Sequence, residues 1–135
     1  MTYVDCYLVP VLRKNKAAYE ELARVSARVL HEFGATRVIE CWLDDSGPEA
    51  STYHGSTARL EFENYATFLQ AAGVRPDETV VVSFVEWPDK ATRDASMEKV
   101  TSDPRMQFEG QPPAFDGKRL IAAGFRPMLD TAGKA

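Results

Sequence analysis

Two carboxylates interrupt segments that otherwise consist of β-forming residues, and they are the strongest candidates for chemistry in this sequence. Asp5 lies within residues 3–12, and Glu40 lies within residues 37–44. A carboxylate that is held beside aromatic rings in a closed cleft can acquire a raised pKa and act as a general base. Asp5 and Glu40 are therefore the candidate catalytic residues.

Aromatic side chains accompany both carboxylates in the alternating pattern of a strand. Tyr7 shares a strand face with Asp5, and Trp42 shares one with Glu40. The candidate cleft-lining residues are Tyr7, Trp42, Trp87 and Arg119. Together with the carboxylates, they could form a binding site for a small organic molecule.

A structural role for the same carboxylates is the main alternative. Asp5 and Glu40 could form ion pairs across a dimer interface with arginines such as Arg119 or Arg37. A further candidate is an anion site built from Arg93, Arg105 and Lys118. Against it, Arg93, Asp94, Asp103 and Arg105 are also suited to capping bonds and salt bridges around the second helix.

Motifs for metal, nucleotide or hydrolase chemistry are missing from the sequence. Neither histidine, His31 or His54, is placed to hold a metal or haem. Cys6 and Cys41 would lie roughly 10 Å apart on strands that are not neighbours, too far for a disulfide. We expect both as small apolar core residues, and we expect no metal and no cofactor.

The charge balance argues against nucleic acid as a partner. The chain has 20 acidic and 16 basic residues and a net charge of −4, whereas phosphate binding favours clustered Lys and Arg. No apolar run approaches the ~20 residues that cross a bilayer, so we expect no membrane association. The opening residues 1–5 lack a basic segment, and we expect a cytoplasmic protein.

The hydrophobic periodicity predicts the elements that must position these side chains. Strands are predicted over residues 3–12, 37–44 and 79–87, and helices over 16–33 and from Pro88 to just before Pro104. Asp116-Gly117 predicts a turn into a last short strand that ends near Gly124. Between these elements we expect a polar loop to residue 56, a weak edge strand over 57–63 and a short helix capped by Asn64.

The order β-α-β-insert-β-α-β is typical of the ferredoxin-like α+β fold, in which two helices cover one face of a four-stranded antiparallel sheet. We expect residues 1–135 to form a single domain of this kind. The other sheet face then needs a partner, and a second copy of the chain is the simplest one. We therefore predict a homodimer.

Alternation along the first strand divides its side chains between the two faces. Val4, Cys6 and Leu8 are predicted to pack on the first helix, which would turn Asp5 toward the dimer cleft. The same parity would direct Ile39, Cys41 and Leu43 to the helices and Glu40 to the cleft. The argument depends on the cost of placing an unpaired carboxylate in an apolar core.

Several short motifs resemble one protein family. They are Tyr3-Val4-Asp5 with Val9-Pro10-Val11, Gly34-Ala35, Glu40-Cys41, Asp44-Asp45, residues 77–81, Arg93-Asp94 with Lys99-Val100, Asp103-Pro104-Arg105, residues 115–119 and Gly124-Phe125. These motifs resemble the YbaA-like family, small bacterial proteins of unknown function in the dimeric α+β barrel superfamily. The resemblance implies a dimeric α+β barrel and carries no catalytic residues. An insert at about 46–75 departs from the family pattern.

Three functions are compatible with this fold. The first is a homodimeric domain that binds or senses a small molecule. The second is a cofactor-free enzyme, monooxygenase-like or isomerase-like, acting on a small organic substrate in the barrel cleft, and the sequence does not decide between these two. RNA binding is disfavoured, because residues 80–85 lack the basic and aromatic pattern that stacks bases.

Overall fold

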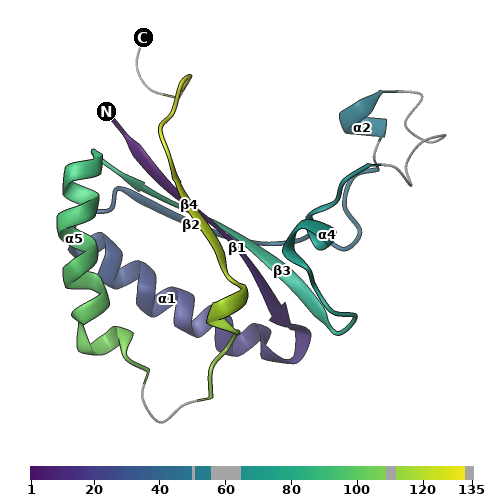
Figure 1. Ribbon diagram of the computed structural model, residues 1–135, viewed down its shortest axis with the longest axis horizontal. Coiled ribbons are helices and arrows are strands. Elements are labelled where there is room, and N and C mark those ends of the chain that lie inside the picture. The colour runs from purple at the N-terminus through teal and green to yellow at the C-terminus, as the bar shows by residue number, and fades with distance from the viewer. Residues whose placement is uncertain (50, 56–64, 109–111, 133–135) are drawn as a thin grey trace.

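The computed structural model describes residues 1–49, 51–55, 65–108 and 112–132, and its main strands and helices follow the predicted order (Figure 1). The strands are β1 (Tyr3–Leu12), β2 (Arg37–Trp42), β3 (Glu78–Trp87) and β4 (Ile121–Phe125), and the long helices are α1 (Lys16–Glu32) and α5 (Lys90–Ser102). The shorter elements are the helices α2 (Ser51–His54) and α4 (Phe68–Ala72) and the 3-10 helices η1 (Arg13–Asn15), η3 (Pro104–Met106) and η4 (Gly117–Arg119).

The four strands form one antiparallel sheet in the order β2-β3-β1-β4. β1 is central, so that Asp5 lies opposite Val85 of β3 on one side and Gly124 of β4 on the other. Both long helices lie on the same side of this sheet (Figure 1). The arrangement confirms the predicted ferredoxin-like α+β fold.

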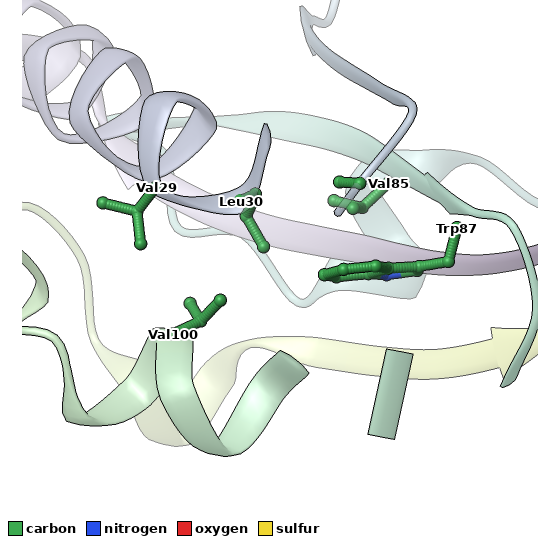
Figure 2. Packing of buried hydrophobic residues seen from close by; sticks show 6 residues of the cluster. Val29, Leu30, Val85, Trp87 and Val100 are labelled. Carbon is green, nitrogen blue, oxygen red and sulfur yellow. The ribbon is translucent and has the colours of Figure 1, made fainter. Parts of the chain in front are cut away.

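The main core lies between the sheet and the two long helices. Val29 and Leu30 of α1, Val100 of α5, and Val85 and Trp87 of β3 are all buried there. Figure 2 shows their side chains converging from the three elements around the indole of Trp87. Truncation of a buried aromatic residue of this kind typically costs about 3–5 kcal/mol, so this ring anchors both helices to the sheet.

Local sequence explains where the two long helices begin and end. α1 ends where Gly34 adopts a φ of 116°, a left-handed value that favours glycine, and the Ala35 N–H then donates to the Leu30 carbonyl at 3.0 Å. α5 begins after Asp89, whose side chain accepts a hydrogen bond from the Thr92 N–H at 2.7 Å. Both ends agree with the sequence prediction.

The insert differs in part from its prediction. The short helix begins at Phe68, and its cap is Thr67, whose side chain accepts from the Gln70 N–H at 3.1 Å. The prediction that Asn64 caps this helix is therefore wrong. Thr67 is the N-cap, because its hydroxyl accepts the hydrogen bond of a backbone N–H in the first turn. The predicted edge strand over 57–63 lies outside the described residues.

The predicted assignment of sheet faces is reversed. Asp5, Tyr7 and Val9 of β1 face the helices, since Asp5 bonds to a side chain of α5 and Val9 lies in a core cluster with Tyr19 of α1. The prediction assumed that a carboxylate on this side would be unpaired and therefore costly to bury. Arg93 of α5 pairs with Asp5 and offsets that free-energy cost. The predicted alternation of side chains along β1 is confirmed, but the helices cover the face opposite to the one that was predicted.

The side of the sheet away from the helices is largely apolar, and we call it the open face. Its apolar residues include Val4, Cys6, Leu8, Ile39, Cys41, Val82, Phe84, Ile121 and Phe125, and the ion pair of Arg37 and Glu86 lies at one end of it. Phe84, Ile121 and Phe125 are 36%, 48% and 53% exposed in the single chain. Cys41 is also exposed, contrary to the prediction of a buried residue, because it belongs to this uncovered face.

Candidate functional site

Asp5, Tyr7, Glu40, Trp42 and Trp87 all lie on the helix-facing side of the sheet. Their hydrogen bonds or packing partners come from α1, from α5 or from one another. The prediction that Asp5, Tyr7, Glu40 and Trp42 share one face of the sheet is therefore correct. The structure divides them between two regions, one around Asp5 and one around Glu40.

The first region, here called the Asp5 cluster, consists of Asp5, Trp87 and Arg93. The Trp87 Nε1–H and the Arg93 Nε–H both donate to Asp5 Oδ2, at 3.1 and 3.0 Å. Asp5 is 3% exposed, and the bond from its carboxylate is the first cause of the raised pKa of Arg93. The cluster ties α5 to the sheet through a buried carboxylate.

This geometry corrects two predictions about Asp5. The residue does not line a cleft on the open face, because its side chain points into the helix-covered core. Its partner is also not Arg119 or Arg37 of a second chain, because Arg93 of the same chain holds it. Arg37 instead lies 3.8 Å from Glu86 of β3.

Tyr7 lies between the two regions, on the boundary of both parts of the core. Burial raises the pKa of its phenol to about 12, and the negative charge of Asp5 adds to the effect. The phenol is therefore neutral at physiological pH, where it can donate a hydrogen bond.

The second region is built around Glu40 on the edge strand β2. Tyr19 Oη of α1 donates to Glu40 Oε1 at 2.9 Å, and Ser83 Oγ of β3 donates to the same oxygen at 2.6 Å. Burial and the nearby charge of Glu40 raise the pKa of Tyr19. Among the described residues, no basic side chain lies within ion-pair distance of Glu40, so two hydroxyl groups fix a carboxylate that remains exposed.

Glu40 opens into a cavity of about 340 Å³ between α1 and β2. We call it the Glu40 pocket; its lining includes Tyr19, Glu20, Arg24, Val38, Glu40 and Trp42.

Aromatic rings form the walls of the Glu40 pocket. The rings of Trp42 and Tyr19 meet edge to face with centroids 5.5 Å apart. The Trp42 Nε1–H donates to Glu20 Oε2 at 2.8 Å, and the Lys16 ammonium lies 4.8 Å from the centroid of the Trp42 ring. These contacts fix the indole at the mouth of the pocket.

Arg119 belongs to neither region. Its guanidinium donates to Glu78 at 2.7 and 2.8 Å and to the Gly73 carbonyl at 2.7 Å. This contact lowers the pKa of Glu78, mainly through the hydrogen bonds from the guanidinium. Arg119 thus braces η4 against the start of β3, away from the other candidate residues.

The candidate anion site of Arg93, Arg105 and Lys118 is not assembled either. Arg93 is held by Asp5, and Arg105 is held by Glu32 and Asp103 at 2.9 Å each. These contacts agree with the prediction that the arginines form salt bridges that fix α5 and the turn that follows. Within the residues that the structure describes, no group of three or more His, Cys, Asp or Glu side chains could hold a metal ion.

Sequence reasoning missed the two residues that position Glu40. The apolar pattern of the first helix does not single out Tyr19, although its ring is buried in the core beneath α1. Ser83 was the better signal, because it is the one hydroxyl within the otherwise apolar run 80–85 of a central strand. A buried hydroxyl in such a strand needs a hydrogen-bond partner.

Comparisons with known proteins agree with this fold and identify the family. The chain is 38% identical to the uncharacterised protein YbaA of Escherichia coli K12 over 130 residues, which cover 96% of this chain and 99% of YbaA. Its structure is similar to that of Rv0793 from Mycobacterium tuberculosis, with a TM-score of 0.55 and 8% identity over 97% of this chain and 99% of that one. A dimeric ferredoxin-like protein from an uncultured marine organism gives a TM-score of 0.52 at 10% identity over 96% and 98%.

The part of the chain that the structure describes contains no helix long and apolar enough to cross a membrane.

The family model for a protein of unknown function, DUF1428, matches residues 2–117. That match and the identity to YbaA confirm the predicted family resemblance. The chain therefore belongs to the DUF1428 family of proteins of unknown function and is a relative of YbaA.

Proposed function

We propose that this protein is a homodimer that binds a small organic molecule in the Glu40 pocket of each chain. The observation that carries the proposal is the Glu40 carboxylate, which two hydroxyl groups hold in one orientation inside a cavity with aromatic walls. Binding sites for small molecules typically combine apolar walls with a few fixed polar groups. The Glu40 pocket has both.

The size of the pocket limits the ligand. Its volume of about 340 Å³ lies at the lower end of the usual range for ligand cavities, roughly 300–1,000 Å³. A ligand with a single ring and a short substituent fits this volume. The site lies under α1 rather than in the cleft between two sheets, so each chain provides a complete pocket.

The open face supports the dimer. It presents Phe84, Ile121 and Phe125 together on one side of the sheet, and exposed apolar patches of this kind mark interaction surfaces. A similar structure is described as a dimeric ferredoxin-like protein. Arg37 is the one basic residue within the four strands, and it lies beside Glu86 at one end of this face. The strands therefore offer no basic cluster there, which supports the prediction that the protein does not bind RNA.

A cofactor-free enzyme with Glu40 as general base is the second candidate. It is favoured by the exposure of Glu40, which a substrate in the pocket could reach. Asp5 is less suited to that role, because it is buried and both Arg93 and Trp87 donate hydrogen bonds to its Oδ2. Binding without chemistry requires fewer groups than catalysis, and the pocket contains those groups.

The two tryptophans allow a direct test of the ligand site by nuclear magnetic resonance of ¹⁵N-labelled protein. The chain has 2 tryptophans, Trp42 at the pocket and Trp87 in the core, and each gives one indole N–H signal. In a screen of small organic compounds, we expect binders to shift the Trp42 signal and leave the Trp87 signal in place. A screen in which no compound moves Trp42 would contradict the proposed site.

The oligomeric state is tested separately by light scattering. We expect about twice the 15.0 kDa chain mass for the natural sequence and a single chain for Phe84→Glu, which places a charge in the open face. Leu129→Glu is the matched control, since this residue is 76% exposed and lies beyond the last strand. A monomeric natural protein would overturn the dimer.

A further inference from the structure

We infer that the Glu40 pocket binds a small organic cation, an ammonium or amidinium group carried on a flat ring. The inference rests on the proposed function and adds the charge and shape of the ligand. Glu40 differs from the other carboxylates of the sheet in its partners.

Each of the other three carboxylates within strands β1 to β4 has an arginine partner. Asp5 pairs with Arg93 at 3.0 Å and Glu78 with Arg119 at 2.7 Å. Glu40 has no basic partner within the described part of the chain, although it accepts two hydrogen bonds. A negative charge that is fixed but not neutralised is the element that selects a cation.

The hydrogen bonds also leave one oxygen of Glu40 available. Tyr19 and Ser83 both donate to Oε1, and no described residue donates to Oε2. Because Oε1 is held from two sides, Oε2 has a fixed direction and can accept an N–H bond from a ligand without reorganisation. An amidinium or ammonium group supplies such N–H donors together with the complementary charge.

The aromatic wall favours the same ligand class. The Lys16 ammonium lies 4.8 Å from the centroid of the Trp42 ring, a position in which the electron-rich indole attracts a positive charge. The lining contains a second carboxylate, that of Glu20, and one guanidinium, that of Arg24, so its acidic groups outnumber its basic one. Arg24 itself lies near Glu20 and Glu21, at 3.7 and 3.5 Å.

The test compares three compounds of nearly identical shape: benzamidine as the cation, benzamide as the neutral form and benzoate as the anion. Affinities are measured from the shift of the Trp42 indole signal on titration. We expect benzamidine to bind at least about tenfold more tightly than benzamide, a difference that a charged hydrogen bond readily supplies. Benzoate should not move the signal.

Two variants assign the preference to Glu40. Glu40→Gln keeps the size and the acceptor oxygen but removes the charge, so benzamidine should lose its advantage over benzamide. Glu98→Gln, on the exposed side of α5, is the matched control and should keep it. Unchanged positions of the Trp87 signal show that each variant is folded.

The outcomes separate this inference from the proposed function. Equal binding of benzamide and benzamidine, or an unchanged preference in Glu40→Gln, would overturn the cation preference and leave the small-molecule site in place. The same holds if benzamidine does not bind while compounds of other charge move the Trp42 signal. If no compound of any charge moves that signal, both fail together.

Discussion

Asp5 and Glu40 lie on the same face of the same sheet, yet their surroundings differ in every respect that decides function. Asp5 is in the central strand, 3% exposed, and held by an arginine and an indole. Glu40 is in an edge strand, exposed, and held by two hydroxyl groups, and no basic side chain of the described residues lies within ion-pair distance of it. Asp5 stabilises the packing of α5 on the sheet, whereas Glu40 remains available to a ligand.

The position of each strand in the sheet explains the difference. β1 has neighbours on both sides and α5 above it, so a charge there must be neutralised within the chain. β2 has a neighbour on one side only, and water reaches its side chains from the open edge. A carboxylate at that edge can keep its charge without an ion pair.

The largest expected effect comes from breaking the Asp5 cluster. Arg93→Ala removes the cation and leaves a buried carboxylate, which should lower the free energy of unfolding by about 3 kcal/mol. Urea denaturation of the variant and the natural protein measures this loss.

Arg24→Ala provides the control for that measurement. Arg24 is 62% exposed in its ion pairs with Glu20 and Glu21, so its removal should cost less than about 1 kcal/mol. Equal effects of Arg93→Ala and Arg24→Ala would contradict the structural role of the Asp5 cluster.

A smaller effect is expected at alkaline pH, from Tyr7 between the two regions. Its pKa is raised from 10.0 to about 12 by burial, so the folded state favours the neutral phenol. This contribution to stability is complete below about pH 10 and is lost as the pH rises through about 12.

Denaturation between these pH values should therefore show a falling stability that is reduced in Tyr7→Phe, because the phenylalanine cannot ionise. Tyr53→Phe, at a residue that is 70% exposed, should leave the natural pH dependence unchanged. A pH dependence that is identical in Tyr7→Phe and the natural protein would show that Tyr7 is not insulated from solvent.

The smallest effect is expected at Glu40. Glu40→Gln keeps an acceptor for Tyr19 and Ser83, and the residue is exposed, so stability should change by less than about 1 kcal/mol. Asp5→Asn should cost clearly more, because it removes the buried charge with which Arg93 pairs and leaves Arg93 only its exposed partner Asp94. Thermal denaturation of both variants tests this contrast, and equal losses would remove the distinction between the two regions.

The sequence predicted most of the fold. Alternating strands, a helix ended by Gly34 and another opened by Asp89 are local signals, and all of them agree with the structure. The order of elements also predicted correctly that the strands of Cys6 and Cys41 are not neighbours in the sheet. Grouping Asp5, Tyr7, Glu40 and Trp42 on one face was also correct, because strand parity is a property of each strand alone.

The covered face and the two separate regions could not be predicted in the same way. Both faces of β1 are largely apolar, so hydrophobicity does not distinguish the side that the helices take. The choice depends on Arg93, which lies 88 residues after Asp5, and on the ring of Trp87 between the two helices. Contacts at that sequence distance leave no periodic pattern in either segment.

The first strand to be synthesised is the one that needs partners from the far end of the chain. β1 begins at Tyr3, while its neighbours β3 and β4 begin at Glu78 and Ile121. At roughly 5–20 residues per second, a ribosome takes several seconds to produce them. During that interval β1 has no sheet neighbour, and unpaired apolar strands readily associate with other chains. The sheet can form only when most of the chain has been made, whereas α1, built from local contacts, can form long before it.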